Sequence, residues 1–424
     1  MPFVADLRVV LRGPDFRRLF AVRLVSQAGD GAFQVALASL IFFSPERATT
    51  AAAAAGALAA SVLPYTVVGP FAGVLLDRWR RRQVLLVANA VRTLIVLGVA
   101  ALILAGVVGP VLYVVVLAAL SVNRFFLAGL GASLPHVVPA DELVMANAVS
   151  PTCGTLAAIT GGFVGYGLRE ALGVSDRTDA VVLVAAATAY ATSALLATRI
   201  AAGLLGPDGA DEQRPATGVQ ALRDGARHVR ERRAAFDALA AIGLHRFAYG
   251  ISFISTILLC RNYFTAAADV DSGFTLLALV FAALGAGFAV AAVLTPLGTA
   301  RWGASGWIWR CFTAAALTQT VLVATINVPL VLGAAVVLGI AGQGSKICVD
   351  AIVQAAVDDD YRGRVFSFYD VVFNLAFVVA AATAALVVPA DGYSRPVYAL
   401  IAVLYAVAAL GYGQTVTRRT LAVS

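Results

Sequence analysis

Long apolar runs fill almost the whole chain of 424 residues, and short charged or glycine- and proline-containing segments separate them. Each run is about 20 residues or longer, the length that a helix needs to cross the hydrocarbon core of a bilayer. The strands of a membrane barrel would instead be about ten residues long with alternating polarity. The pattern therefore predicts twelve transmembrane helices, over residues 17–43, 50–76, 83–106, 110–134, 147–168, 179–203, 235–260, 274–298, 306–327, 329–353, 365–388 and 394–416.

Polar positions inside these runs recur at an offset of about 222 residues. The offset leads from Arg124 in the fourth run to Lys346 in the tenth. It also relates four polar positions of the first run to four of the seventh: Arg23, Gln27, Asp30 and Gln34 to His245, Tyr249, Ser252 and Thr256. An offset of six helices predicts an all-α membrane fold of two parallel six-helix bundles, related by an axis along the membrane normal.

The longest polar stretch divides the two sets of six runs. It begins with prolines and glycines and ends in an arginine-rich amphipathic segment, which is typical of a linker followed by a surface helix. We therefore expect an N-terminal six-helix bundle over 1–203, a cytoplasmic linker with an amphipathic helix over 204–234, and a C-terminal six-helix bundle over 235–424.

Composition excludes a soluble or a disordered protein. Hydrophobic residues make up 60% of the chain, charged residues 13%, and the mean hydropathy is +0.87, whereas soluble domains hold about 25% charged residues. The net charge of +7 could indicate a nucleic-acid partner, but the basic residues lie in short runs between apolar segments, as the positive-inside rule requires. We expect no nucleic-acid partner, a location in the bacterial cytoplasmic membrane, and both termini in the cytoplasm.

The polar positions of the first run, spaced four, three and four residues apart, share one face of a helix. An ionisable group that faces lipid at the bilayer centre costs from about 2.5 kcal/mol upward, so this face should line the bundle interior or a water-filled cavity. Asp30 lies near the middle of its run and is our first candidate for a proton carrier. A structural ion pair, with Arg23 as the possible partner within the helix, is the alternative.

Lys346 is the only lysine among 31 basic residues. Lysine can lose its proton when it is desolvated, whereas arginine stays charged. Asp350 lies one helical turn further on, so we expect an ion pair that a substrate or a proton could displace. Asp370 is a further coupling candidate, and the cavity candidates are Arg23, Gln27, Gln34, His245, Tyr249, Ser252 and Asn374; for Gln34 and Ser252, hydrogen bonding between helices is the alternative.

Residues 73–82, between the second and third runs, resemble the G-x-L-x-D-R-x-G-R-R signature of the major facilitator superfamily. The positions that fit are Gly73, Leu75, Asp77, Arg78, Arg81 and Arg82, while Arg80 replaces the usual glycine. The resemblance implies that this loop locks the two halves together on the cytoplasmic side when the transporter opens outward. Asp77 would then face the N-terminal end of a helix in the other half, and Arg78 and Arg81 would pair with carboxylates or lipid phosphates.

Three shorter segments, 23–30, 143–148 and 362–367, resemble the macrolide and siderophore exporters of this superfamily. Arg124 lies where such exporters often carry a fourth-span arginine tied to proton coupling. Span five offers a loose version of the antiporter glycine motif, with Gly154, Gly161, Gly162 and Gly165. The resemblance also implies that spans one, four, seven and ten line a central cavity.

We therefore expect a monomeric secondary transporter that exports a small amphipathic molecule, such as a drug, macrolide or siderophore, in exchange for protons. Its partners would be this substrate, protons and membrane lipids, with no cofactor and no metal. A lipid flippase or an importer of the same fold is the alternative. A polytopic membrane enzyme is disfavoured, because Asp358–Asp360 has no second acidic cluster to help hold Mg²⁺ and no Walker loop precedes the lysine.

Overall fold

The computed structural model describes residues 12–37, 79–107, 109–173, 175–206, 218–265 and 270–421, and every regular element in these ranges is a helix. The long helices are α2 (Pro14–Leu37), α4 (Arg81–Leu104), α5 (Pro110–Ser133), α6 (Leu143–Leu172), α7 (Asp176–Ala197), α8 (Gly218–Glu231), α9 (Arg233–Leu258), α10 (Val270–Ala324), α11 (Val328–Ala356), α12 (Asp359–Val387) and α13 (Arg395–Leu421). Short helical turns lie at Leu134–His136 (η3) and Ala140–Glu142 (η4), and a π-helical segment lies at Leu259–Tyr263 (η5).

Nine of the described helices are long and apolar enough to cross a membrane. The chain reverses within α10 at Gly303, whose φ of +69° favours glycine, so α10 supplies both the eighth and the ninth predicted span. With this division and the charged α2, eleven of the twelve predicted spans coincide with helices; the second, 50–76, lies outside the described residues. The prediction of an all-α membrane fold is confirmed.

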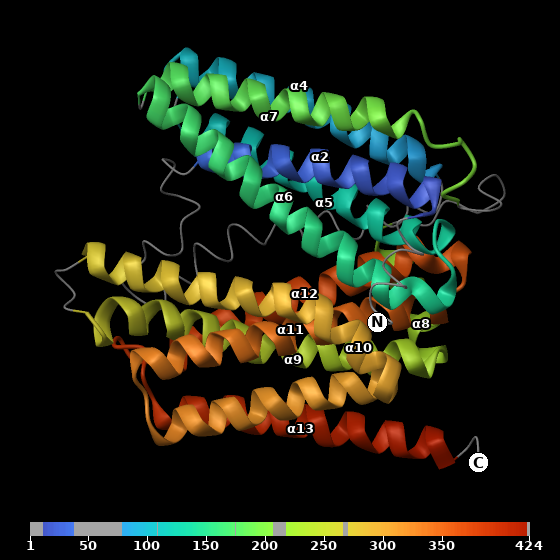
Figure 1. The fold of residues 1–424 in the computed structure, drawn as a ribbon, viewed down its shortest axis with the longest axis vertical. Coiled ribbons are helices and arrows are strands. Elements are labelled where there is room, and N and C mark those ends of the chain that lie inside the picture. Colours follow the sequence, from blue (N-terminus) through green and yellow to red (C-terminus); the bar gives the residue numbers. More distant parts are fainter. Residues whose placement is uncertain are drawn as a thin grey trace.

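The helices form two halves, an N-terminal half (α2 and α4–α7) and a C-terminal half (α9–α13), which lie one above the other in Figure 1. Adding 222 to the bounds of α2 gives 236–259, against 233–258 for α9. The same shift takes α5 onto α11 and α7 onto α13 to within four residues at each end, and α6 onto α12 to within seven. The predicted offset of 222 residues therefore relates the helices of the two halves as well as their polar positions.

Side chains on the outside of both halves are large and apolar. Leu94, Phe163 and Leu195 in the N-terminal half are each at least 70% exposed, and Leu386 in the C-terminal half is 87% exposed. An apolar surface of this extent suits lipid rather than water.

Glycines bring α2 and α6 into backbone contact. A Cβ on Gly31 would lie 1.7 Å from the carbonyl oxygen of Ala158, and a Cβ on Gly161 would lie 1.9 Å from that of Ala28. Because not even a Cβ fits in this space, glycine is required at these two positions. Gly161, one of the span-five glycines noted in the sequence, thus has a packing role.

One end of the molecule carries the linker helix. Figure 1 shows α8 at the end where α2 starts and α13 finishes. There α8 packs on the start of α12: the His228 ring stacks on Tyr361 at a centroid distance of 4.4 Å, and Gly225 contacts the backbone of Arg364. Residues Gly218–Glu231, within the predicted linker, thus form a helix that packs on α12.

Candidate functional site

A cavity of about 660 Å³ lies between the two halves. Its lining residues come from α2, α5 and α6 on one side and from α10, α11 and α12 on the other. The polar or charged side chains in its wall are Arg23, Gln27, Arg124, Asn147, Thr152, Thr155, Gln343, Lys346, Asp350, Gln354, Tyr369 and Asp370.

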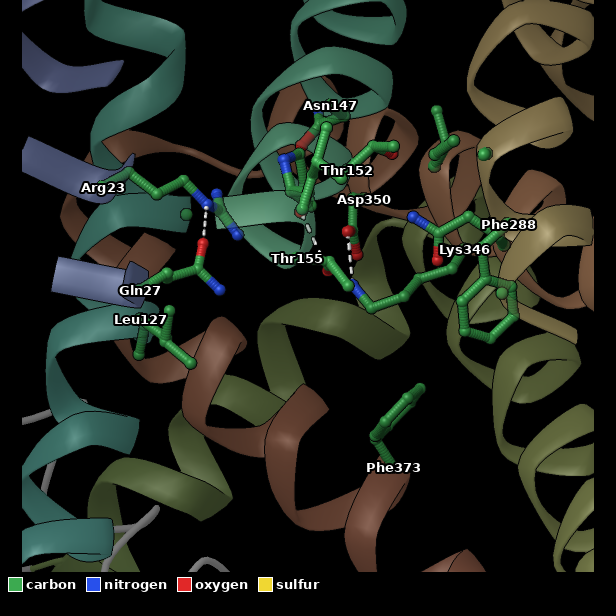
Figure 2. Close-up of a pocket in the computed structure, with 18 of the residues that line it drawn as sticks. Arg23, Gln27, Leu127, Asn147, Thr152, Thr155, Phe288, Lys346, Asp350 and Phe373 are labelled. Carbon is green, nitrogen blue, oxygen red and sulfur yellow. Dashed lines mark hydrogen bonds and ion pairs between the residues drawn. The ribbon is translucent and has the colours of Figure 1, made fainter. Parts of the chain in front are cut away.

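Arg23 and Gln27 enter this cavity from α2 (Figure 2). The Arg23 Nε donates to Gln27 Oε1 at 2.9 Å, and its Nη1 donates to Ser150 Oγ of α6 at 3.3 Å. Gly154 leaves the space for this pair, because a Cβ there would lie 1.7 Å from Gln27 Oε1 and 2.9 Å from Arg23 Nε. A second glycine of span five thus shapes the cavity wall.

Lys346 and Asp350 face these residues from α11 (Figure 2). The predicted ion pair is present, with Lys346 Nζ 2.6 Å from Asp350 Oδ2. The other carboxylate oxygen accepts a hydrogen bond from the hydroxyl of Tyr369 at 2.8 Å. The side chain of Lys346 is 37% exposed and that of Asp350 is 11% exposed, so the pair lies at the cavity surface with the lysine reaching into it.

Arg124 joins the two halves across the cavity. Its Nη2 lies 3.9 Å from Asp370 Oδ1 and donates to Asn374 Oδ1 at 3.5 Å, both on α12. A second link runs between α6 and α11, where Asn147 donates to Gln354 Oε1 at 2.6 Å. Both links connect residues more than 200 positions apart in the sequence.

Asp30 is not among the described residues that line the cavity. Its carboxylate pairs with Arg92 of α4 and accepts a hydrogen bond from the hydroxyl of Tyr190 of α7 at 2.9 Å. The Arg92 guanidinium stacks on the Tyr190 ring at 3.8 Å and also donates to Ser26. The partner of Asp30 is therefore Arg92 and not Arg23, because α4 and α7 cover the side of α2 to which the carboxylate turns.

Five other predicted cavity residues are also absent from the described lining, among them Asn374, the partner of Arg124. Gln34 is exposed. His245 is buried and bonds to the Tyr405 hydroxyl of α13, and Ser252 is buried and bonds to Gln319 of α10. Tyr249 packs on Phe253 and Phe377. No described lining residue of this cavity belongs to α9, so α6, α10 and α12 take the place that the family resemblance gave to span seven.

Arg246 of α9 is a site residue that the sequence analysis missed. Its guanidinium lies 4.0 Å from the ring centre of Phe373, a lining residue, and 4.4 Å from that of Phe377. Its Nε is buried and has no hydrogen-bond partner in the described part of the chain. An arginine inside an apolar run was visible in the sequence, but the offset of 222 does not relate it to another charge.

A cluster of four side chains closes one end between the halves; we call it the Asp359 cluster (Arg81, His136, Asp359 and Arg362). Arg81, at the start of α4, is completely buried and lies 3.0 Å from Asp359 Oδ1 at the start of α12. The same oxygen contacts His136 at 2.9 Å and pairs with Arg362. The predicted pairing of Arg81 with a carboxylate is therefore present, and it joins the two halves.

Of the other signature positions named as the gating motif, the structure describes only Arg82. Arg82 donates to the carbonyl oxygen of Thr198 at 3.0 Å, within the N-terminal half. Gly73, Asp77 and Arg78 lie outside the described residues. The acidic Asp358–Asp360 segment forms the N-terminal cap and first turn of α12, where Asp358 pairs with Arg232 at 2.5 Å.

No protein-family model matches the chain. An uncharacterized MFS-type transporter of Mycobacterium tuberculosis is 37% identical over 391 residues, which cover 91% of this chain and 88% of the relative. The fold is similar to that of a bacterial homologue of the iron transporter ferroportin in an outward-facing state (TM-score 0.71, 15% identity, 94% of this chain and 99% of that chain). It is also similar to the Escherichia coli fucose:proton symporter (TM-score 0.69, 12% identity, 94% and 98% of the two chains).

A cavity between two repeated helical halves, together with the match to an MFS-type transporter, makes the protein a multi-pass membrane transporter rather than an enzyme. The extent and identity of the mycobacterial match make the assignment specific: the chain belongs to the major facilitator superfamily.

Proposed function

We propose that the protein is a proton-coupled exporter of a small amphipathic molecule that works by alternating access. The observation that carries the proposal is the cavity between the halves together with the Asp359 cluster, which joins the halves at one end. A site that both halves line can open to either side when one half rocks against the other. The resemblance to exporters in the first span and before the eleventh supports the outward direction.

The distribution of arginines supports an orientation with the Asp359 cluster in the cytoplasm. Helices α4, α9 and α12 begin at that end, close to Arg80–Arg82, Arg230–Arg233 and Arg362–Arg364. The opposite end, where α7 and α13 begin, has fewer arginines, as the positive-inside rule requires of an external face. In this orientation the conformation described here is closed toward the cytoplasm.

Asp350 and Asp370 are the proposed proton carriers. Both line the cavity, and each is paired with a cation that becomes free when the carboxylate takes up a proton. Asp30, the first candidate from the sequence, is held by Arg92 and Tyr190 away from the lining residues. We therefore place proton exchange at the cavity surface and give Asp30 a structural role.

The test is transport by purified protein in liposomes with an imposed pH gradient, screened against a library of cationic, neutral and anionic amphipathic compounds. We expect gradient-driven flux for at least one class, and loss of that flux in Asp350→Asn or Asp370→Asn. Exchange of labelled for unlabelled substrate should survive in these variants, because exchange needs no net proton movement. Asp141→Asn, on the exposed surface, is the matched control; flux that does not depend on the pH gradient would refute proton coupling.

A lipid flippase is the second candidate function, and one feature of the cavity favours it. Leu156 and Ile159 of α6 line the cavity and are 61% and 51% exposed. This part of the cavity wall is therefore apolar and accessible, as a lipid chain would require. Movement of a fluorescent phospholipid between leaflets of the same liposomes, without flux of any library compound, would favour this function.

A further inference from the structure

The membrane-embedded charges of the described residues do not balance. Four carboxylates inside the helical spans have a cationic partner, in the pairs Asp30–Arg92, Asp179–Arg169, Asp350–Lys346 and Asp370–Arg124. Three arginines inside the spans, Arg23, Arg246 and Arg310, form no ion pair with any residue that the structure describes. Residues 50–76, the predicted span outside the described ranges, contain no Asp or Glu in their sequence.

Arg23 is the one of these arginines that lines the cavity. Two of the five N–H groups of its guanidinium are used, one on Gln27 and one on Ser150. These two bonds and the space at Gly154 fix the plane of the group. The remaining N–H groups have no partner among the described residues. Asp350 faces Arg23 from the opposite wall, but its two oxygens are taken by Lys346 and Tyr369.

Arg246 adds a second uncompensated positive charge close to the cavity. Its guanidinium stacks on Phe373, and the Lys346 ammonium lies 5.9 Å from the same ring. The lining side chains alone comprise three cations, Arg23, Arg124 and Lys346, against two carboxylates. A surplus positive charge in a low-dielectric interior is unfavourable unless a counter-ion compensates it.

Much of the rest of the wall is apolar. Its large apolar side chains include Leu127, Leu156, Ile159, Phe281, Phe288 and Phe366. A ligand that satisfied both parts of this wall would carry one oxyanion group and an apolar body.

We infer that the cavity binds an amphipathic organic anion, whose carboxylate or equivalent oxyanion accepts hydrogen bonds from the free N–H groups of Arg23. Arg246 strengthens binding through its charge. The inference rests on the proposed transport function only in treating the cavity as the substrate site. The exporter resemblance does not favour an anionic, a cationic or a neutral substrate, whereas this inference specifies an anionic one.

The test is equilibrium binding of two fluorescent probes with the same body and opposite charge, dansyl-undecanoic acid and dansyl-undecylamine, to the purified full-length protein. We expect the acid to bind at least about tenfold more tightly than the amine, as a charge-assisted hydrogen bond predicts. Arg23→Gln should weaken binding of the acid about tenfold or more and leave the amine unchanged or tighter. Arg23→Lys keeps the charge but loses the planar group, so it should fall between Arg23→Gln and the wild type.

Arg310→Gln is the control, because Arg310 lies in the second part of α10 and stacks on Trp302, away from the lining residues. Equal binding of the two probes by the wild-type protein, or an unchanged affinity of Arg23→Gln for the acid, would overturn the inference. The wild-type comparison decides the matter even if a variant fails to fold. Binding is measured without a proton gradient, so the two proposals can fail separately. If the protein transports only cations, the inference is refuted and the transport function stands. If it binds the acid but transports no compound, the inference stands and the transport function is refuted.

Discussion

Replacing Asp359 by asparagine should open the end of the molecule that is closed in this structure. The single carboxylate of Asp359 holds Arg81, Arg362 and His136 together across the two halves. Asparagine has nearly the same shape but no charge, so the two guanidinium groups would lose the carboxylate that they share. The conformation described here, in which the two halves meet at the Asp359 cluster, is the one that would be destabilised.

The size of the effect follows from burial. Removing one partner of a fully buried ion pair costs about 3–5 kcal/mol. The Arg81 side chain is fully buried and that of Asp359 is 21% exposed, so solvent screening reduces the cost to about 1.5–3 kcal/mol. Each 1.4 kcal/mol changes an equilibrium constant about tenfold. We therefore expect the equilibrium to shift about 10- to 100-fold away from the conformation described here.

Spin-label distances on both ends of the molecule measure this shift. In a background without the four native cysteines, labels at Asp141 and Arg233 report the closed end, and labels at Arg177 and Arg395 report the opposite end; all four positions are exposed. Asp359→Asn should lengthen the first distance and shorten the second.

The matched control is Asp360→Asn, which removes a neighbouring exposed carboxylate. It should leave both distance distributions as in the wild type. Unchanged distributions in Asp359→Asn itself would show that the cluster does not hold the end closed.

Two further predictions concern packing and pH. Gly161→Ala should lower the unfolding temperature in detergent, because its Cβ would lie 1.9 Å from the Ala28 carbonyl oxygen and overpacking costs about 1–3 kcal/mol. Gly167→Ala, on the same helix but with open space around it, should leave the unfolding temperature unchanged. Equal effects of the two substitutions would contradict the backbone contact. Burial lowers the pKa of His228 below its usual value of 6.5, against the weaker opposing effect of Asp358, so docking of α8 should be complete above about pH 6.5 and weaken as the pH falls below it. A spin label at Arg230 should then gain mobility in acid, and His228→Phe, which keeps the ring, should abolish this change; a pH response that survives in His228→Phe would exclude His228 as its source.

The sequence predicted the helices well because a bilayer imposes a minimum length on each apolar run. The break between the eighth and ninth apolar runs predicted their separation near Arg301–Gly303. The amphipathic pattern of the linker likewise predicted a helix there. The ion pair of Lys346 with Asp350 was also predictable, since both residues lie on one helix at a fixed spacing.

The partners of Asp30 were not predictable, because periodicity identifies a helix face but not the helix that covers it. Arg92 and Tyr190 reach Asp30 from two other helices. The Asp359 cluster likewise joins residues 278 positions apart. Arg246 escaped notice for a related reason: its surroundings are aromatic rings of α12, and nothing local to α9 indicates them.

The duplicated scaffold does not carry duplicated chemistry. Arg23 stands at the cavity wall, whereas His245, its counterpart 222 positions later, is enclosed by aromatic side chains of its own half. A bound molecule would therefore sit off the pseudo-twofold axis, anchored to one half while the other slides past it. The two halves therefore share an architecture but differ in function, because the binding group Arg23 belongs to the N-terminal half and its counterpart His245 is buried in the other half.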